Sequence, residues 1–267
     1  MKPHTIFAML MLSAGPVAAG PYAPAAGQPG STAISKDSTA FVGWATGYLN
    51  YLPGSGVDAS WQTPLNALGP AAGNSFDIVG LGNGGQLTLS FANPITNGAG
   101  FDFAVFENGF SDTFLELAWI GVSSDGLNFT RFPGISFTPA PVGSFGAVDP
   151  TNIDGFGGKY QQGFGTPFDL ATLAGIPGLD INRVSHVRIM DIIGDGSQFD
   201  NYPGAFGGPH PIYDPNPTSG SGGFDLDAIG ALNVVTVPLP ATIWLMLSGL
   251  SGLFVVSRPR RRSSIAS

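Results

Sequence analysis

Glycine and proline interrupt this chain so often that its central part offers no long helical pattern. The 267 residues include 40 glycines and 23 prolines, just under the share typical of disordered chains. Twenty phenylalanines argue against disorder, since unfolded segments are poor in aromatic residues. Between residues 20 and 236 the apolar runs are short, rich in β-branched and aromatic residues, and bounded by Gly, Pro, Asn and Asp. This pattern predicts an all-β fold, a β-sandwich or jelly roll.

The expected strands follow one another along the second part of the body. They are 76–79, 86–91, 102–107, 115–123, 128–132, 184–190 and 223–233. Residues 71–236 therefore form the expected sandwich, and residues 20–70 are expected to add N-terminal strands and loops. Segments 139–165 and 199–223 are expected to be long loops.

One glycine-rich loop matches a cofactor motif by spacing alone. Gly80, Gly82 and Gly85 satisfy G-x-G-x-x-G, the dinucleotide-binding fingerprint. That fingerprint requires a helix directly after it, because the helix N-terminus holds the pyrophosphate. Residues 86–91 alternate as a strand instead, so we interpret the loop as a hairpin turn.

Acidic side chains dominate the region between the two ends. All eighteen lie between Asp37 and Asp227, and the middle of the chain, from Lys36 to Asp227, holds only five basic residues. Such a body repels phosphate backbones, which excludes nucleic-acid binding. The chain has no cysteine, so disulfides and thiolate metal sites are excluded as well.

The first 19 residues have the features of a secretory signal peptide. Lys2 precedes the apolar run 6–12, and Val17, Ala18 and Ala19 supply small residues for cleavage after Ala19. The apolar run is too short for a stable membrane span. A buried N-terminal helix is the alternative.

The C-terminal end predicts one transmembrane helix. No charged residue occurs from 228 to 257, and the apolar stretch 239–256 has the length that a spanning helix needs. The arginines that follow stay on the cytoplasmic side by the positive-inside rule, which places the body outside. They are Arg258, Arg260, Arg261 and Arg262.

Residues 237–262 resemble the PEP-CTERM sorting signal of Gram-negative bacteria. A proline-containing motif, an uncharged span and a terminal arginine cluster occur in the order typical of that family. The motif consists of Val237, Pro238, Leu239, Pro240 and Ala241. Since the usual third residue is Glu, Leu239 indicates a Val-Pro-Leu-Pro-Ala variant. The resemblance implies export through the inner membrane, an exosortase-type membrane protease as partner, and delivery to the cell surface or extracellular matrix. An ordinary anchor that stays attached is the alternative.

A looser resemblance covers about residues 76–233. The strand–turn–strand 122–129 and the segments 186–189 and 224–229 look like strands of galactose-binding-like jelly rolls. Bacterial surface proteins of this type also carry a Val-Phe-Glu-Asn segment, here 105–108. The resemblance implies binding of sugars or other polar surfaces, often with a structural calcium ion.

Five carboxylates are candidate ligands for one structural Ca²⁺: Asp102, Glu107, Asp191, Asp225 and Asp227. The first two bracket one expected strand, and Asp191 lies at the exit of another. Asp225 and Asp227 are two apart in a strand and would share a face. Calcium takes six to eight oxygen ligands, which acidic turns supply readily. The alternative is that these acids cap turns or face water.

The sequence favours binding over catalysis. Neither a G-x-S-x-G nor an HExxH motif occurs. Beyond the signal peptide the histidines are His186, expected on a strand surface, and His210, expected in a loop. We expect a non-catalytic structural or adhesive protein, or alternatively a carbohydrate-binding module for exopolysaccharide. A glycan-active enzyme that pairs Glu107 with Glu116 is a third alternative.

Aromatic side chains in Gly- and Pro-rich surroundings are candidates for stacking against sugars. They are Trp44, Tyr48, Tyr51, Trp61, Tyr160, Tyr202 and Tyr213. The alternative is that several of them cover the sandwich core, since Trp and Tyr are usually largely buried.

Overall fold

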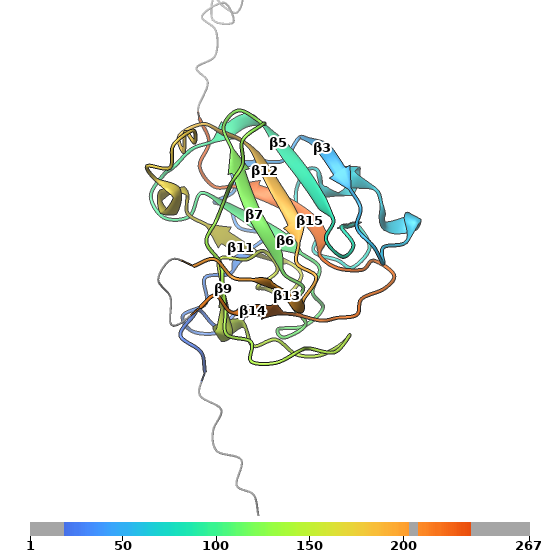
Figure 1. The fold of residues 1–267 in the computed structure, drawn as a ribbon. Coiled ribbons are helices and arrows are strands. Elements are labelled where there is room, and N and C mark those ends of the chain that lie inside the picture. Colours follow the sequence, from blue (N-terminus) through green and yellow to red (C-terminus); the bar gives the residue numbers. More distant parts are fainter. Residues whose placement is uncertain (1–18, 203–207, 236–267) are drawn as a thin grey trace, which may run out of the picture. The chain divides into compact units, whose positions relative to one another are not determined.

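Antiparallel pairing builds two main sheets in this computed structural model, which describes residues 19–202 and 208–235 (Figure 1). The first sheet has the order β1-β11-β6-β15-β2, and β4 also pairs with β15. Its strands are β1 (Ile34–Ser35), β2 (Gly43–Trp44), β4 (Val79–Gly80), β6 (Phe103–Glu107), β11 (Phe164–Phe168) and β15 (Asp225–Ala231). The second sheet has the order β3-β5-β12-β7-β8. Its strands are β3 (Gly47–Leu52), β5 (Gln86–Ile95), β7 (Ala118–Ser123), β8 (Thr130–Arg131) and β12 (Val184–Asp191).

Smaller elements complete the described part of the chain. One two-stranded ladder joins β9 (Ile135–Ser136) to β10 (Ile153–Asp154), and another joins β13 (Asp195–Phe199) to β14 (Pro211–Tyr213). The helices are short 3-10 turns: η1 (Ala59–Trp61), η2 (Pro64–Ala67), η3 (Pro150–Asn152) and η4 (Leu170–Leu173). None of the helices in the described ranges is long and apolar enough to cross a membrane.

The main hydrophobic core lies between the two sheets. It contains inward-facing side chains of β6 and β15 from the first sheet and of β5, β7 and β12 from the second. Phe103 of β6 stacks on Phe168 of β11 with ring centroids 5.2 Å apart. Such packing of two antiparallel sheets around a shared core is the arrangement of a β-sandwich.

The central strands are covered on both faces, which explains their nearly continuous apolar sequence. Every residue of β6, β7 and β15 is buried. On the outer face of β7, Trp119 packs edge-on against Phe156 in a second apolar cluster. On the outer face of β6, Phe106 packs against Phe41 and Trp44 in a third.

The all-β prediction is confirmed for the described residues, including the hairpin of β7 and β8 around the Ser-Asp-Gly turn. The hairpin interpretation of the 80–85 loop is wrong. The strand before it, β4, pairs with β15, whereas β5 after it pairs with β3 and β12. The loop therefore carries the chain from one sheet to the other, and a strand rather than a helix follows it.

Both segments expected to be long loops contain short strands. Segment 139–165 includes β10 and the start of β11, and segment 199–223 includes β14. The signal-peptide prediction for 1–19 falls on residues outside the described part except for Ala19, and the sorting-signal prediction for 237–262 lies outside it entirely.

Candidate functional site

Five buried acids converge at one end of the two sheets. Glu107 ends β6 beside the start of β15, where Asp225 lies. Asp191 ends β12 beside the start of β7, which Glu116 precedes by two residues. Because neighbouring strands are antiparallel, the end of one lies beside the start of the next. Asp214, directly after β14, joins this group, which we name the acid cluster.

Asp191 joins the glycine loop to the segment that leads into β15. The Gly84 N–H donates to its Oδ2 at 2.7 Å, and the Phe224 N–H donates to its Oδ1 at 2.7 Å. In addition, the Asp191 N–H donates to the carbonyl of Gly85 at 2.9 Å. The 80–85 glycine loop therefore contributes to the site, because its backbone donates a hydrogen bond to the buried carboxylate of Asp191.

Backbone donors also hold one oxygen each of two further acids. The Leu117 N–H donates to Asp214 Oδ2 at 2.8 Å, and the Gly109 N–H donates to Glu107 Oε2 at 2.6 Å. Both donors belong to segments that adjoin strands, so the ends of the sheets fix the positions of the side chains.

Other carboxylate oxygens of the acid cluster have no protein partner. Glu107 Oε1 and Asp225 Oδ1 are buried and accept no hydrogen bond within the described residues. The carboxylate of Glu116, whose side chain is 6% exposed, likewise accepts none within the same part of the chain. A buried polar atom without a partner costs free energy, so a ligand that donates hydrogen bonds to these oxygens would remove that cost.

Burial raises the pKa of all five carboxyls, because a low-dielectric surrounding disfavours the ionised form. The pKa of Asp191 rises to about 7 and that of Asp225 to about 6. The pKa values of Glu107, Glu116 and Asp214 lie well above the usual range for the same reason. Repulsion adds to burial, since the charge of Asp225 raises the pKa of Glu107 and the charge of Glu107 raises that of Glu116. The cluster therefore retains protons near neutral pH.

A cavity of about 410 Å³ opens onto the acid cluster. Glu116 and Asp225 line it, together with the side chains of Asn108 and Ser221. Hydrogen bonds from Ser221 and Asn108 act against burial and lower the pKa of Asp225. The volume lies within the ~300–1,000 Å³ typical of small-molecule sites, and convergent polar groups in such a cavity indicate a binding site.

Four aromatic side chains line the cavity: Trp61, Phe110, Phe114 and Phe145. Phe110 stacks on Phe114 with ring centroids 4.2 Å apart, and Phe114 stacks on Phe145 at 6.2 Å. Phe110 is 57% exposed and Phe145 is 85% exposed, although both are large apolar side chains. An exposed aromatic stack beside a polar cavity is a feature of ligand-binding surfaces.

Two of the five predicted calcium ligands have other roles. Asp102 accepts hydrogen bonds from the N–H groups of Gly98 and Leu170 and from the side chain of Asn233, at 2.7 to 2.9 Å. Glu107, Asp191 and Asp225 do belong to one cluster. The sequence prediction missed Asp214, and it named Glu116 only as the partner of Glu107 in the enzyme alternative. Within the described residues, however, no three acidic, histidine or cysteine side chains converge in a way that could hold a metal ion.

Asp227 is separated from Asp225 by a local irregularity in β15. The pairing with β6 shifts register between Leu226 and Ala228, so Asp227 lies in a β-bulge. A bulge inserts an extra residue and redirects side chains, which breaks the alternation assumed from sequence. Asp227 instead accepts hydrogen bonds from two consecutive N–H groups, those of residues 72 and 73, at 2.8 Å each.

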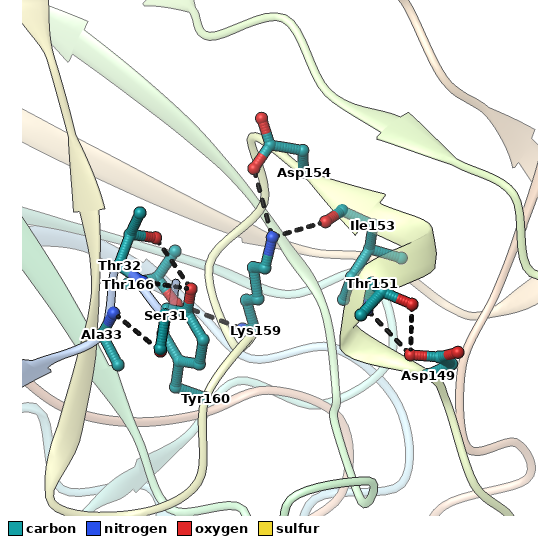
Figure 2. A network of polar contacts seen from close by, with 10 residues as sticks. All are labelled: Ser31, Thr32, Ala33, Asp149, Thr151, Ile153, Asp154, Lys159, Tyr160 and Thr166. Atoms are coloured by element: carbon teal, nitrogen blue, oxygen red, sulfur yellow. Dashed lines mark hydrogen bonds and ion pairs between the residues drawn. The ribbon is translucent and has the colours of Figure 1, made fainter. Parts of the chain in front are cut away.

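A buried lysine lies beside a second cavity, of about 360 Å³. Figure 2 shows that Lys159 Nζ is aimed at the carbonyl of Ile153 and the carboxylate of Asp154, at 2.8 and 3.3 Å. Nearby, the hydroxyls of Tyr160 and Thr32 are 2.8 Å apart. Burial lowers the pKa of Lys159. Because these groups satisfy one another, we assign this network to structure: it ties the N-terminal segment to the region around β10.

The predicted sugar-stacking residues have several different environments. Trp61 lines the cavity at the acid cluster, and Tyr202 lines the second cavity. Tyr160, by contrast, is 1% exposed, so its prediction as an exposed aromatic is wrong. Trp44 packs against the core, and the hydroxyl of Tyr51 donates to the carbonyl of residue 80 at 2.7 Å. The stacked phenylalanines were not among the predicted aromatics, all of which are Trp or Tyr, because an exposed Phe cannot be told from a core Phe by residue type alone.

The two histidines in the described part of the chain belong to other parts of the fold. His186 lies on β12, partly buried, with Nδ1 2.8 Å from the hydroxyl of Ser185. His210 directly precedes β14 and pairs with Asp200 at 2.9 Å. Neither residue lines the cavity at the acid cluster.

Comparison with models of known protein families finds none that matches this chain, and comparison with curated proteins finds no match either.

Proposed function

We propose that the chain is an exported, non-catalytic surface or matrix protein that adheres to polysaccharide through the cavity at the acid cluster. One observation carries the proposal: a single cavity combines buried carboxylates and an amide with an exposed stack of phenylalanine rings. Sugars present hydroxyl groups and apolar C–H faces on the same unit, so they need both kinds of surface.

The polar side chains supply complementary hydrogen-bonding groups. Glu116 and Asp225 accept hydrogen bonds from hydroxyls in either protonation state and also donate when protonated, and Asn108 and Ser221 can both donate and accept. Phe110 offers a flat apolar face at the rim, where a sugar ring can stack. This division between orienting polar groups and an apolar wall is common in small-molecule sites.

Export and sorting belong to the same proposal. The signal peptide at 1–19, the motif at 237–241, the apolar span 239–256 and the terminal arginines support passage through the inner membrane and processing by an exosortase-type protease. We take the body to be a jelly roll of the galactose-binding-like kind. Cell fractionation tests the location: the body should lie outside the inner membrane, and full-length protein in the cytosol would contradict the proposal.

The stacked phenylalanines provide a test of polysaccharide binding. Phe110→Ala should weaken retention of the exported protein on its polysaccharide about three- to tenfold, since an aromatic contact contributes about 1 kcal/mol. Leu127→Ala is the matched control, because Leu127 is also a large exposed apolar side chain but does not line the cavity. Polysaccharide pull-down and glycan arrays measure the effect. Equal retention of both variants, or no retained glycan with the unmodified protein, would count against the proposal.

Two further proposals compete with this one or extend it. A glycan-active enzyme is favoured by the position of Glu116, whose carboxyl has a raised pKa and lines the cavity. Turnover of a glycan that disappears in Glu116→Gln would support that enzyme.

A structural calcium ion remains a prediction, and an unchanged melting temperature in excess chelator would remove it.

A further inference from the structure

We propose that the cavity selects a cationic saccharide unit, one with a free protonated amine, over neutral or anionic units. The proposal rests on the saccharide-binding function proposed above and adds the charge of the ligand to it.

The first observation is that no basic side chain of the described residues forms an ion pair with the acid cluster. The acid cluster brings five carboxyl groups together, and none of the five residues is more than 6% exposed. The ion pairs of the described residues join other acids: Lys36 to Asp37, Lys159 to Asp154 and His210 to Asp200. A buried charge is stable only when it is paired, so the cluster must take up either protons or an external cation.

Unpartnered acceptors that reach the cavity are the second, independent observation. Glu116 and Asp225 both line the cavity, and the structure pairs neither the Glu116 carboxylate nor Asp225 Oδ1 with a donor from the described residues. An ammonium group has three N–H donors and no acceptor. It therefore matches a wall of carboxylate oxygens better than a hydroxyl, which brings one donor and its own lone pairs.

The aromatic wall favours an organic cation over a bare metal ion. Phe110, Phe114 and Trp61 line the same cavity, and an aromatic face attracts a cation and also stacks on an apolar ring. Ca²⁺ takes six to eight oxygen ligands around one point, and although five acids lie in the cluster, no three acidic, histidine or cysteine side chains of the described residues are arranged to hold one ion. An amino sugar combines the ammonium group and the ring face on one unit.

Proton linkage adds a distinctive signature. A cation binds the ionised carboxyls, so near neutral pH it competes with protons for them. The reason is that burial raises the pKa of Asp225 to about 6 and that of Asp191 to about 7. The titrating groups that face the cavity or adjoin it are Glu107 of β6, Glu116 before β7, Asp191 of β12, Asp214 after β14 and Asp225 of β15. Binding of the amine should release protons, and affinity should fall as the pH drops below about 6.

Isothermal titration of the exported protein at pH 7 with three matched tetrasaccharides tests the proposal. They are a β-1,4-linked glucosamine tetramer, its fully N-acetylated form and a glucose tetramer. The glucosamine tetramer should bind about tenfold more tightly than the others, as expected when a charge-assisted hydrogen bond is gained. Glu116→Gln should bring the three affinities within about twofold of one another. Asp37→Asn, at an exposed acid outside the cavity, should leave the preference unchanged.

The outcomes separate this inference from the function on which it rests. Equal or tighter binding of the acetylated or glucose tetramer overturns the charge preference and leaves saccharide binding intact. No binding of any saccharide removes both. Calcium chloride provides a further arm: if Ca²⁺ raises the melting temperature of the unmodified protein but not of Glu116→Gln, and also displaces the glucosamine tetramer, the site is a metal site and the inference fails. Asp225→Asn, measured in parallel, removes a different carboxylate of the same cavity and should also lose the preference for the glucosamine tetramer. Loss of the preference in Glu116→Gln alone would indicate misfolding of that variant and would count against the proposal.

Discussion

At the scale of single residues, Gly223 has no Cβ, and this lets a backbone N–H group reach the carboxylate of Asp191 in the acid cluster. Gly223 has φ of +66°, and a Cβ at this position would lie 2.5 Å from Asp191 Oδ1. Only glycine tolerates both the left-handed backbone and the close contact. The next residue, Phe224, can then donate its N–H to the same carboxylate. The glycine run before β15 therefore belongs to the site.

A pair of glycine substitutions isolates this contact. Gly220 also has positive φ, +82°, but has open space around its Cβ position, so Gly220→Ala should cost about 1 kcal/mol of unfolding free energy from backbone strain alone. Gly223→Ala should cost about 2–3 kcal/mol, because it adds displacement of Asp191 to the same strain. Urea unfolding of both variants measures the difference. Equal costs would show that the contact with Asp191 has no energetic weight.

Sequence reasoning could find some members of the acid cluster and not others. Glu107, Asp191 and Asp225 were predictable because each lies at the end of a recognisable strand. Asp214 was not, since it follows a three-residue strand in a proline-rich segment with no alternating pattern to mark it. Asp227 was wrongly paired with Asp225, because a β-bulge depends on the neighbouring strand and leaves no local trace in sequence.

At the scale of strands, the long strands could be predicted from the sequence and most of the short ones could not. The central strands β5, β6, β7, β12 and β15 all fall on predicted segments. Burial of both faces produces apolar runs in β6, β7 and β15, and β5 and β12 are long enough for their buried positions to recur. Strands of two residues, such as β1 and β9, carry too few side chains to form a pattern. Pairing was the harder problem: the 80–85 loop has the composition of a hairpin turn, yet its two flanking strands belong to different sheets. Partner choice depends on the whole core, not on the turn.

At the scale of the whole molecule, the acid cluster couples stability to pH. An acid with a higher pKa in the folded state than in the unfolded state favours folding when protonated. Its contribution is intact below the unfolded pKa and is lost as the pH rises through the folded pKa. For Asp225 that window runs from 3.8 to about 6, and for Asp191 from 3.8 to about 7. The protein should therefore lose stability from this cluster between about pH 4 and pH 7.

Removing one carboxyl from the cluster tests this dependence. Asp225→Asn should gain about 3 kcal/mol relative to the unmodified protein between pH 4 and pH 7, since each pKa unit corresponds to about 1.4 kcal/mol. Urea unfolding across that range gives the two curves. Asp37→Asn, at an exposed acid, should run parallel to the unmodified protein. Parallel curves for Asp225→Asn as well would show that burial does not raise the pKa of Asp225 in the folded state.

The position of β15 also determines how the body would respond to a mechanical pull. Asp225 starts this strand at the cavity, and Ala231 ends it about 20 Å away, four residues before the described chain ends at Val235. On one side β15 pairs with β6, and on the other it pairs with β2 and β4. A force applied at Val235 along the strand loads these ladders in shear, so their hydrogen bonds must break together rather than one by one. A body tethered through its C-terminal side would resist drag along a strand that is hydrogen-bonded to neighbours on both sides.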